Sequence, residues 1–138
     1  MKQSLGAIAI AIAACVAVHA QAACTKAEIA KAEKAVDAVA TWPQMQKTIT
    51  QWKQCDAGSV DALFTETLIR MLVDWKNLDA LENAMKDADF KAFVVKHLQS
   101  PEAKDDVQMV YSRAKASCPA SREALCAEFV DMTKASSK

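Results

Sequence analysis

Hydrophobic residues recur at helical spacing along most of the chain, and the strongest pattern covers residues 59–76. Apolar side chains there follow the i, i+3, i+4, i+7 spacing of an amphipathic helix, so one broad stripe must pack against neighbouring elements. We expect this segment to be the central helix of the fold. The predicted buried stripe consists of Val60, Leu63, Phe64, Thr67, Leu68, Met71, Leu72 and Trp75.

The same segment has a second apolar side, which a charged stripe separates from the first. A helix with two apolar sides lies between neighbours or offers its second side to a partner. We predict a partner face here; the alternatives are burial of its apolar members and ordinary solvation of its charged ones. The predicted partner face consists of Ala62, Ile69, Val73, Glu66, Arg70 and Asp74.

Two helices are predicted ahead of this segment. Thr25 and Glu28 form a capping box that begins a first helix, which should end near Thr41. Thr41 and Gln44 repeat the start signal for a second helix, and Gly58 suits the backbone at its far end. Because the joint between them is short, these helices are expected to fold as an antiparallel hairpin.

Further helices are predicted after the central segment. Asn77 can cap a short fourth helix, and either Asp87 or Asp89 can cap a fifth helix over residues 90–98. Pro101 is suited to the first turn of a sixth helix, because it needs no backbone donor there.

The sixth helix should end at Cys118, and the last should run from about Ser121 to residue 132, followed by a flexible polar tail over residues 133–138. Gly58 is the one glycine after residue 22 and alanine is abundant, which favours helices over strands. The sequence therefore predicts an all-α fold. We expect a compact bundle of six to seven short helices in antiparallel hairpins, stapled by disulfides, as a single domain over residues 23–132.

Residues 1–22 are typical of an export signal that is cleaved from the mature protein. Lys2 supplies a positive start, an apolar run follows, and Ala20 and Ala22 frame a cleavage site. We expect cleavage after Ala22, with Ala20 as the second choice. The apolar run is shorter than the roughly 20 residues of a membrane-spanning helix, and no later segment of that length is free of charge, so we expect no membrane span.

Cys15 allows a second interpretation of this segment. Residues 12–15 resemble the bacterial lipoprotein signal, which implies acylation of Cys15 and a lipid anchor. The alternative is a cysteine within a discarded signal, since the apolar run continues past it into a conventional cleavage region. The signal, the size and the alanine-rich helices resemble small exported proteins of Gram-negative bacteria. We therefore expect a periplasmic or secreted protein.

Four cysteines remain after cleavage, which in an exported chain predicts two disulfides with three possible connectivities. Cys24 and Cys55 would meet at the open end of the first hairpin, so this is the preferred pair. Cys118 and Cys126 would be about 12 Å apart along a continuous helix, which is too far for a disulfide. Their pairing requires a break in the helix, and Pro119 can supply one.

Few side chains suited to catalysis or cofactor binding remain after the signal is removed. His97 is then the single histidine, and none of the spaced patterns of triads, zinc sites or haem attachment is present. Its place on an apolar helix face favours a core histidine with one hydrogen bond over a ligand or base. Without Lys2 there are 16 basic and 17 acidic residues, a balance that does not favour nucleic acid. We expect no metal, cofactor or nucleic acid.

These observations favour a non-catalytic protein that binds another envelope protein as an adaptor, an inhibitor or an immunity-type partner. The alternative is a carrier of a small apolar ligand in a cavity between helices. An enzyme would have to use acidic side chains alone or a site that the sequence does not reveal. The residues that would line the carrier's cavity are Trp52, Met71, Trp75, Phe90, Phe93 and His97.

Overall fold

A computed structural model describes residues 24–134, so the expected signal, Cys15 and residues 135–138 lie outside the described range. Within it the regular structure is entirely helical, as the all-α prediction requires. None of the helices between residues 24 and 134 has the length and apolar character to cross a membrane. In chain order the elements are α1 (Lys26–Asp37), α2 (Trp42–Trp52), η1 (Lys53–Cys55), α3 (Ser59–Asp74), α4 (Leu78–Ala84), α5 (Ala88–Leu98), η2 (Pro101–Ala103), α6 (Lys104–Ala116), η3 (Ala120–Arg122) and α7 (Glu123–Lys134), where η marks a 3₁₀ turn.

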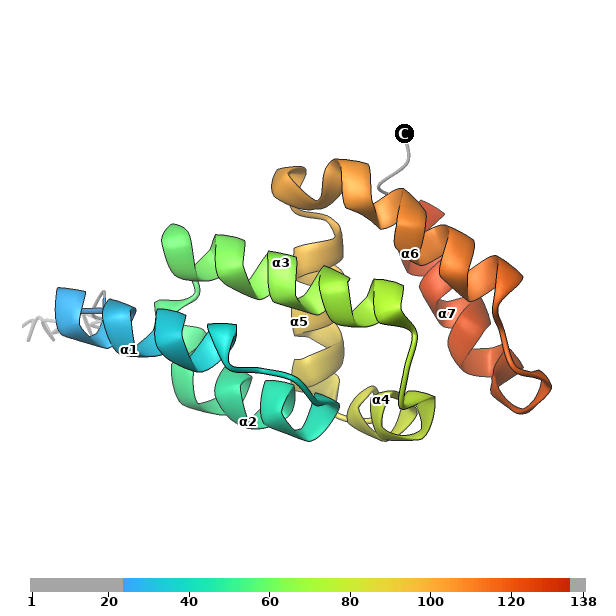
Figure 1. Ribbon diagram of the computed structural model, residues 1–138, viewed down its shortest axis with the longest axis horizontal. Helices are drawn as coiled ribbons and strands as arrows, with labels where there is room; N and C mark the ends of the chain where they lie inside the picture. Colours follow the sequence, from blue (N-terminus) through green and yellow to red (C-terminus); the bar gives the residue numbers. More distant parts are fainter. Residues whose placement is uncertain (1–23, 135–138) are drawn as a thin grey trace, which may run out of the picture.

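The helices are arranged around α3, which crosses the middle of the molecule (Figure 1). α1 and α2 form the N-terminal hairpin, and α1 also packs along α3. α5 runs across α3, and the short α4 packs against α2. α6 and α7 form the C-terminal hairpin, whose α6 also contacts α3. The central helix therefore touches both hairpins.

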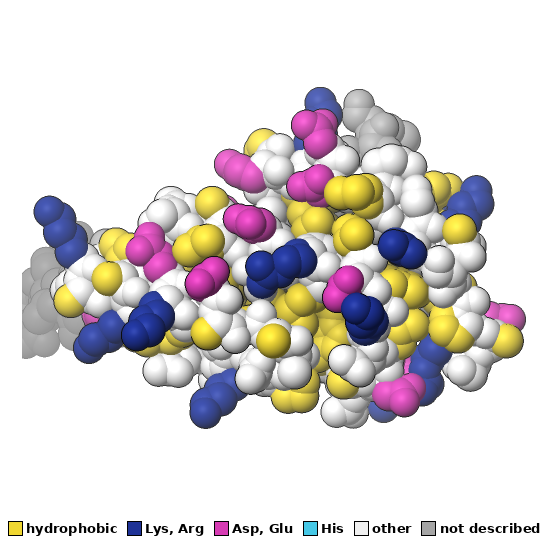
Figure 2. All heavy atoms as spheres, viewed as in Figure 1, with side chains coloured by type: hydrophobic (Ala, Val, Ile, Leu, Met, Phe, Trp, Pro, Cys, Tyr) yellow, Lys and Arg dark blue, Asp and Glu magenta, His cyan; other side chains and the backbone are white. Residues whose placement is uncertain are grey.

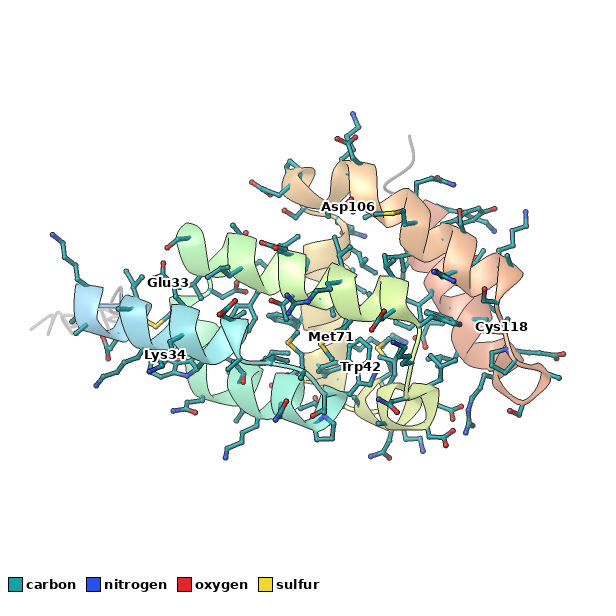
Figure 3. All side chains as sticks on the ribbon, viewed as in Figure 1. Glu33, Lys34, Trp42, Met71, Asp106 and Cys118 are labelled. Carbon is teal, nitrogen blue, oxygen red and sulfur yellow. A yellow bond between two sulfur atoms is a disulfide. The ribbon has the colours of Figure 1, made fainter. Side chains whose placement is uncertain are left out.

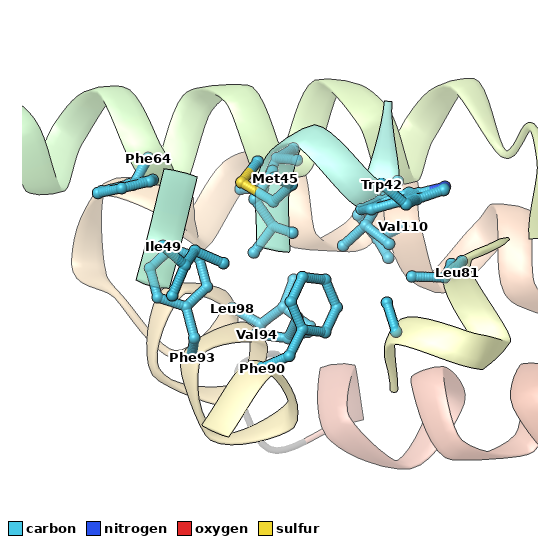
Figure 4. Packing of buried hydrophobic residues seen from close by; sticks show 14 of the residues in the cluster. Trp42, Met45, Ile49, Phe64, Leu81, Phe90, Phe93, Val94, Leu98 and Val110 are labelled. Carbon is cyan, nitrogen blue, oxygen red and sulfur yellow. The ribbon is translucent and has the colours of Figure 1, made fainter. Parts of the chain in front are cut away.

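The predicted stripe of α3 provides the centre of the core. Phe64, Leu68 and Leu72 are fully buried. Apolar side chains of α2 and α5 fill the space beside them, among them Met45 and Phe93 (Figure 4). Each large apolar side chain that is fully buried contributes about 1.5–3 kcal/mol relative to exposure. Burial of this stripe therefore fixes the position of α3.

The two predicted capping boxes are present, and the second one shortens α1. Thr25 caps α1, while Thr41 and Gln44 cap α2. The backbone N–H groups of Ala40 and Thr41 donate to Oε1 of Gln44, at 2.9 and 3.1 Å. These donors are therefore not available to continue α1, which ends at Asp37 rather than near Thr41.

α3 ends at Asp74 rather than Lys76, because Trp75 adopts a left-handed conformation (φ 51°, ψ 43°). This conformation is unusual for a bulky residue. The indole of Trp75 is buried, and its Nε1 donates to the carbonyl of Ser117 at 3.2 Å. Asn77 is left-handed as well; it occupies the N-cap position of α4 as predicted, but its side chain makes no cap hydrogen bond.

Local hydrogen bonds set the helix boundaries in the C-terminal half. Asp87, rather than Asp89, caps α5 by accepting from the backbone N–H of Phe90 at 3.0 Å. α7 includes Thr133, where the sequence predicts the tail to begin. Thr133 is buried, and its hydroxyl donates to the carbonyl of Phe129 at 2.7 Å. Thr133 therefore belongs to the packed domain.

The four cysteines form two disulfides, the preferred Cys24–Cys55 pair and the Cys118–Cys126 pair. Cys24 and Cys55 have Cα atoms 5.3 Å apart, and their bridge ties the start of α1 to the end of η1. Cys118 and Cys126 have Cα atoms 6.0 Å apart. Pro119 and the η3 turn interrupt the helix between this second pair, as the spacing argument requires.

Loss of the Cys24–Cys55 bridge should destabilise the protein more than loss of the Cys118–Cys126 bridge. On the chain-entropy model, sequence separations of 31 and 8 residues correspond to about 3.7 and about 2.5 kcal/mol. Urea denaturation of the Cys24→Ser/Cys55→Ala and Cys118→Ser/Cys126→Ala variants should give this order. The reverse order would show that loop entropy is not the main contribution of these bridges.

Candidate functional site

A groove of about 600 Å³ lies between α3 and α6. Figure 2 shows hydrophobic side chains in the hollow between these helices, with acidic and basic side chains along its edges. All six residues of the predicted partner face line this α3–α6 groove, together with residues of η2 and α6. Its lining consists of Ala62, Thr65, Glu66, Ile69, Arg70, Val73, Asp74, Glu102, Asp106 and Met109.

The apolar side chains of the α3–α6 groove differ in how far they reach into solvent. Ile69 is 5% exposed and forms part of the core as well as the groove, whereas Val73 is half-buried and Ala62 is exposed. Met109 is 47% exposed and is the one exposed large hydrophobic side chain among residues 24–134. A flexible methionine beside other apolar side chains makes an adaptable contact surface. Met109 therefore belongs to the groove and not to the core.

The α6 wall of the groove is a feature that the sequence interpretation missed. Glu102, Asp106 and Met109 are spaced by four and three residues, so they share one helical face. Figure 3 shows Asp106 on α6, at the edge that borders α3. The spacing is visible in the sequence, but a stripe of mixed charge is also typical of an ordinary solvated helix face.

The depression continues beyond Met109 as a second hollow of about 420 Å³ along α6. Val73 and Met109 line both hollows, so the two adjoin each other. The second hollow otherwise has small and polar walls, formed by Gln108, Ser112, Arg113, Ala116 and Ser117.

Charge is unevenly distributed along this depression. Among the described residues that line the α3–α6 groove, Arg70 is the one basic side chain and four residues carry carboxylates. A hydrogen bond from Ser100 lowers the pKa of Glu102, so this carboxylate is ionised at neutral pH. In the second hollow Arg113 is the one charged side chain. The four carboxylates of the groove are Glu66, Asp74, Glu102 and Asp106.

The residues of the predicted carrier cavity lie in or beside the core, and the structure does not bring them around one cavity. Met71 and Phe90 line separate hollows of about 90 and about 300 Å³. The rings of Phe93 and His97 are in contact, with centroids 4.1 Å apart, which leaves no space between them. The members that pack among core residues are Trp52, Trp75, Phe93 and His97.

A buried polar cluster, here called the Asp56 cluster, joins the turn after η1 to α3 and α5. His97 is fully buried, with Nε2 3.2 Å from Oδ2 of Asp56 and Nδ1 2.7 Å from Oγ1 of Thr65. The ammonium group of Lys96 lies 2.5 Å from Asp56 and 2.8 Å from Asp61. His97 therefore has two hydrogen-bond partners, where the sequence predicts one. The Asp56 cluster consists of Asp56, Asp61, Thr65, Lys96 and His97.

The pKa values in the Asp56 cluster reflect a balance between burial and hydrogen bonding. Burial of the Asp56 carboxyl group opposes its ionisation, but hydrogen bonds from His97 and Lys96 outweigh burial and hold its pKa below the usual value. Desolvation of Lys96 is likewise outweighed by its bonds to Asp56 and Asp61, which raise the pKa of its ammonium group. Both groups are therefore charged at neutral pH.

The same cluster contains atoms that can ligate a metal ion. Oxygen atoms of Asp56 and Asp61 and a ring nitrogen of His97 lie within 4.8 Å of one another. Two carboxylates and an imidazole suit a divalent cation. However, the Lys96 ammonium group contacts both carboxylates and already supplies the compensating positive charge. A metal ion at these atoms would have to displace Lys96.

Thr65, His97 and Asp56 also follow the order of hydroxyl, imidazole and carboxylate that nucleophilic triads use. A substrate would have to reach the hydroxyl of Thr65, which is 3% exposed, and the imidazole is fully buried. The Thr65 hydroxyl also lies 3.0 Å from the carbonyl of Asp61 within the same helix. We therefore assign the Asp56 cluster to holding α3, α5 and the turn after η1 together.

Comparison with known protein families, curated proteins and solved structures gives no match for this chain. The α3–α6 groove and the Asp56 cluster are therefore the features from which a function can be inferred. Of the two, the groove is open to solvent, whereas His97 and Thr65 at the centre of the cluster are buried.

Asp56→Asn should lower the free energy of unfolding by about 1 to 3 kcal/mol at pH 7, because it leaves the buried His97 without its carboxylate partner and Lys96 with Asp61 alone. Urea denaturation measures this difference. Lys53→Ala is the matched control: it breaks an ion pair with Asp89 whose side chains are 59% and 81% exposed. The control should change stability by less than about 0.5 kcal/mol. Similar losses in both variants would contradict a special role for the cluster.

The Asp56 cluster should also make the wild-type protein sensitive to acid. Because the pKa of Asp56 is lower in the folded protein than in the unfolded chain, its carboxylate stabilises the fold above the unfolded-state pKa. This contribution is lost as the pH falls through the lower, folded-state pKa. Urea denaturation at pH 7, 4 and 3 should show that the free energy of unfolding falls more steeply with decreasing pH for wild type than for Asp56→Asn. Parallel pH profiles would contradict this prediction.

Proposed function

We propose that this protein is an exported, non-catalytic binding protein that attaches to another envelope protein through the α3–α6 groove. The proposal is carried by one observation: the six residues of the second face of α3 line a single groove together with the exposed Met109. Apolar surface that is rimmed by charged side chains is typical of protein interaction sites. An adaptor, an inhibitor or an immunity-type partner would use such a surface without performing chemistry.

The place of action in this proposal is the periplasm or the extracellular space. The Cys24–Cys55 and Cys118–Cys126 disulfides support it, because such bonds persist in oxidising compartments. The signal pattern over residues 1–22 supports the same destination. Removal of that segment would leave the disulfide-linked helices intact.

Met109→Glu should abolish complex formation without changing the thermal midpoint of the protein. The new carboxylate would lie among the existing carboxylates at the centre of the contact surface, while the 47% exposed position tolerates a polar side chain. Native mass spectrometry of the protein purified from its own envelope without reductant measures the complex. Wild type should carry a second polypeptide in fixed proportion, and Met109→Glu should carry none.

Ala30→Glu is the matched control, since it adds the same charge at an exposed position of α1 that does not line the groove. It should retain the second polypeptide. The proposal is wrong if Met109→Glu retains the polypeptide as well as Ala30→Glu does, or if wild type carries none. Ile69→Asp is a poorer test, because Ile69 is 5% exposed and its replacement would also disturb the core.

A further inference from the structure

We propose that the partner presents an amphipathic helix with basic residues to the α3–α6 groove. This inference rests on the proposed function and adds the chemistry of the partner. Docking of a helix into a groove requires an apolar floor for anchor side chains and walls that border it on two sides. Ile69, Val73 and Met109 provide the apolar part, and α3 with η2 and α6 provides the walls.

The length of the depression matches a short helix. α6 has 13 residues, which corresponds to about 20 Å at a rise of 1.5 Å per residue. The two adjoining hollows together border its whole length, from Glu102 in η2 to Ser117 just after α6. A partner helix of about three to four turns has this length. Its apolar side chains at i, i+3 or i+4, and i+7 would lie against Val73 and Met109.

The charge of the groove favours basic residues on this helix. Glu66 and Asp74 stand on the α3 wall, and Glu102 and Asp106 stand on the opposite wall, so a helix between them has carboxylates on both sides. The carboxylates of Glu66 and Asp106 make no hydrogen bond or ion pair within residues 24–134, so both are available to a cation. Complementary charge of this kind steers association and selects the partner.

A second copy of this chain is a poor occupant of the groove. In a symmetric dimer, the same patch of each copy faces its counterpart, which would bring two acidic grooves together. Like charges in one interface oppose association by several kcal/mol. A basic helix of another protein meets no such repulsion.

The test uses the full mature protein and three labelled peptides of about 14 residues, with binding followed by fluorescence anisotropy at low salt. The first peptide has leucine at helical anchor spacing and lysine on its flanks. The second replaces each lysine by glutamate, and the third has the composition of the first in an order without helical periodicity. The first peptide should bind, and the other two should bind at least about tenfold more weakly.

Charge reversal in the protein then locates the site. Glu102→Lys/Asp106→Lys should weaken binding of the lysine peptide about tenfold and strengthen binding of the glutamate peptide. Asp37→Lys/Glu123→Lys is the matched control, because both of these acids are exposed and neither lines the groove. The control should bind all three peptides as wild type does. Raising the salt concentration to 0.15 M should weaken binding of the lysine peptide to both the wild-type and the control protein.

In the peptide experiments, two results would overturn this inference: equal binding of the three peptides, or equal effects of the two charge reversals. If either occurs while Met109→Glu still removes the native partner, the groove binds protein and only the partner's chemistry is wrong. If Met109→Glu also has no effect, the proposed function fails as well. A wild-type dimer that Met109→Glu dissociates would assign the groove to self-association and overturn the inference.

Discussion

The structure depends on the burial of α3 on two sides. Phe64, Leu68 and Leu72 on its wide face are enclosed by the N-terminal hairpin and α5. The opposite side is left to η2 and α6, which bury Ile69 but leave Val73 half-covered. Among residues 24–134, no further element completes the cover. The α3–α6 groove is therefore the part of the central helix that the fold does not enclose.

Features that depend on local chemistry could be predicted from the sequence. The capping boxes at Thr25 and Thr41 each lie within four residues, and the structure confirms both. The helical periodicity of residues 59–76 identified the central helix and its second face. The break at Pro119 made a Cys118–Cys126 pair feasible, although spacing alone left three connectivities open. In each case the determining residues are neighbours in the chain.

Features that depend on distant contacts could not be predicted in the same way. Asp56 and His97 meet across 41 positions, and neither a carboxylate in a turn nor a histidine on an apolar face indicates the other. Trp75 occupies a left-handed position that usually favours glycine, because its contacts with Phe129 and Ser117 override the local preference. The α6 wall of the groove could not be predicted, because the sequence does not show which helix faces the second side of α3.

Each wall of the α3–α6 groove lies next to a part of the chain that a disulfide cross-links. One disulfide closes the N-terminal hairpin beside α3, the other closes the C-terminal hairpin, and Trp75 packs between α3 and that second hairpin. The α3–α6 groove is therefore preorganised, and it loses little conformational entropy when a partner binds. A partner segment that is disordered when free would bear nearly all of the ordering cost, so affinity would vary with that segment's own helix propensity.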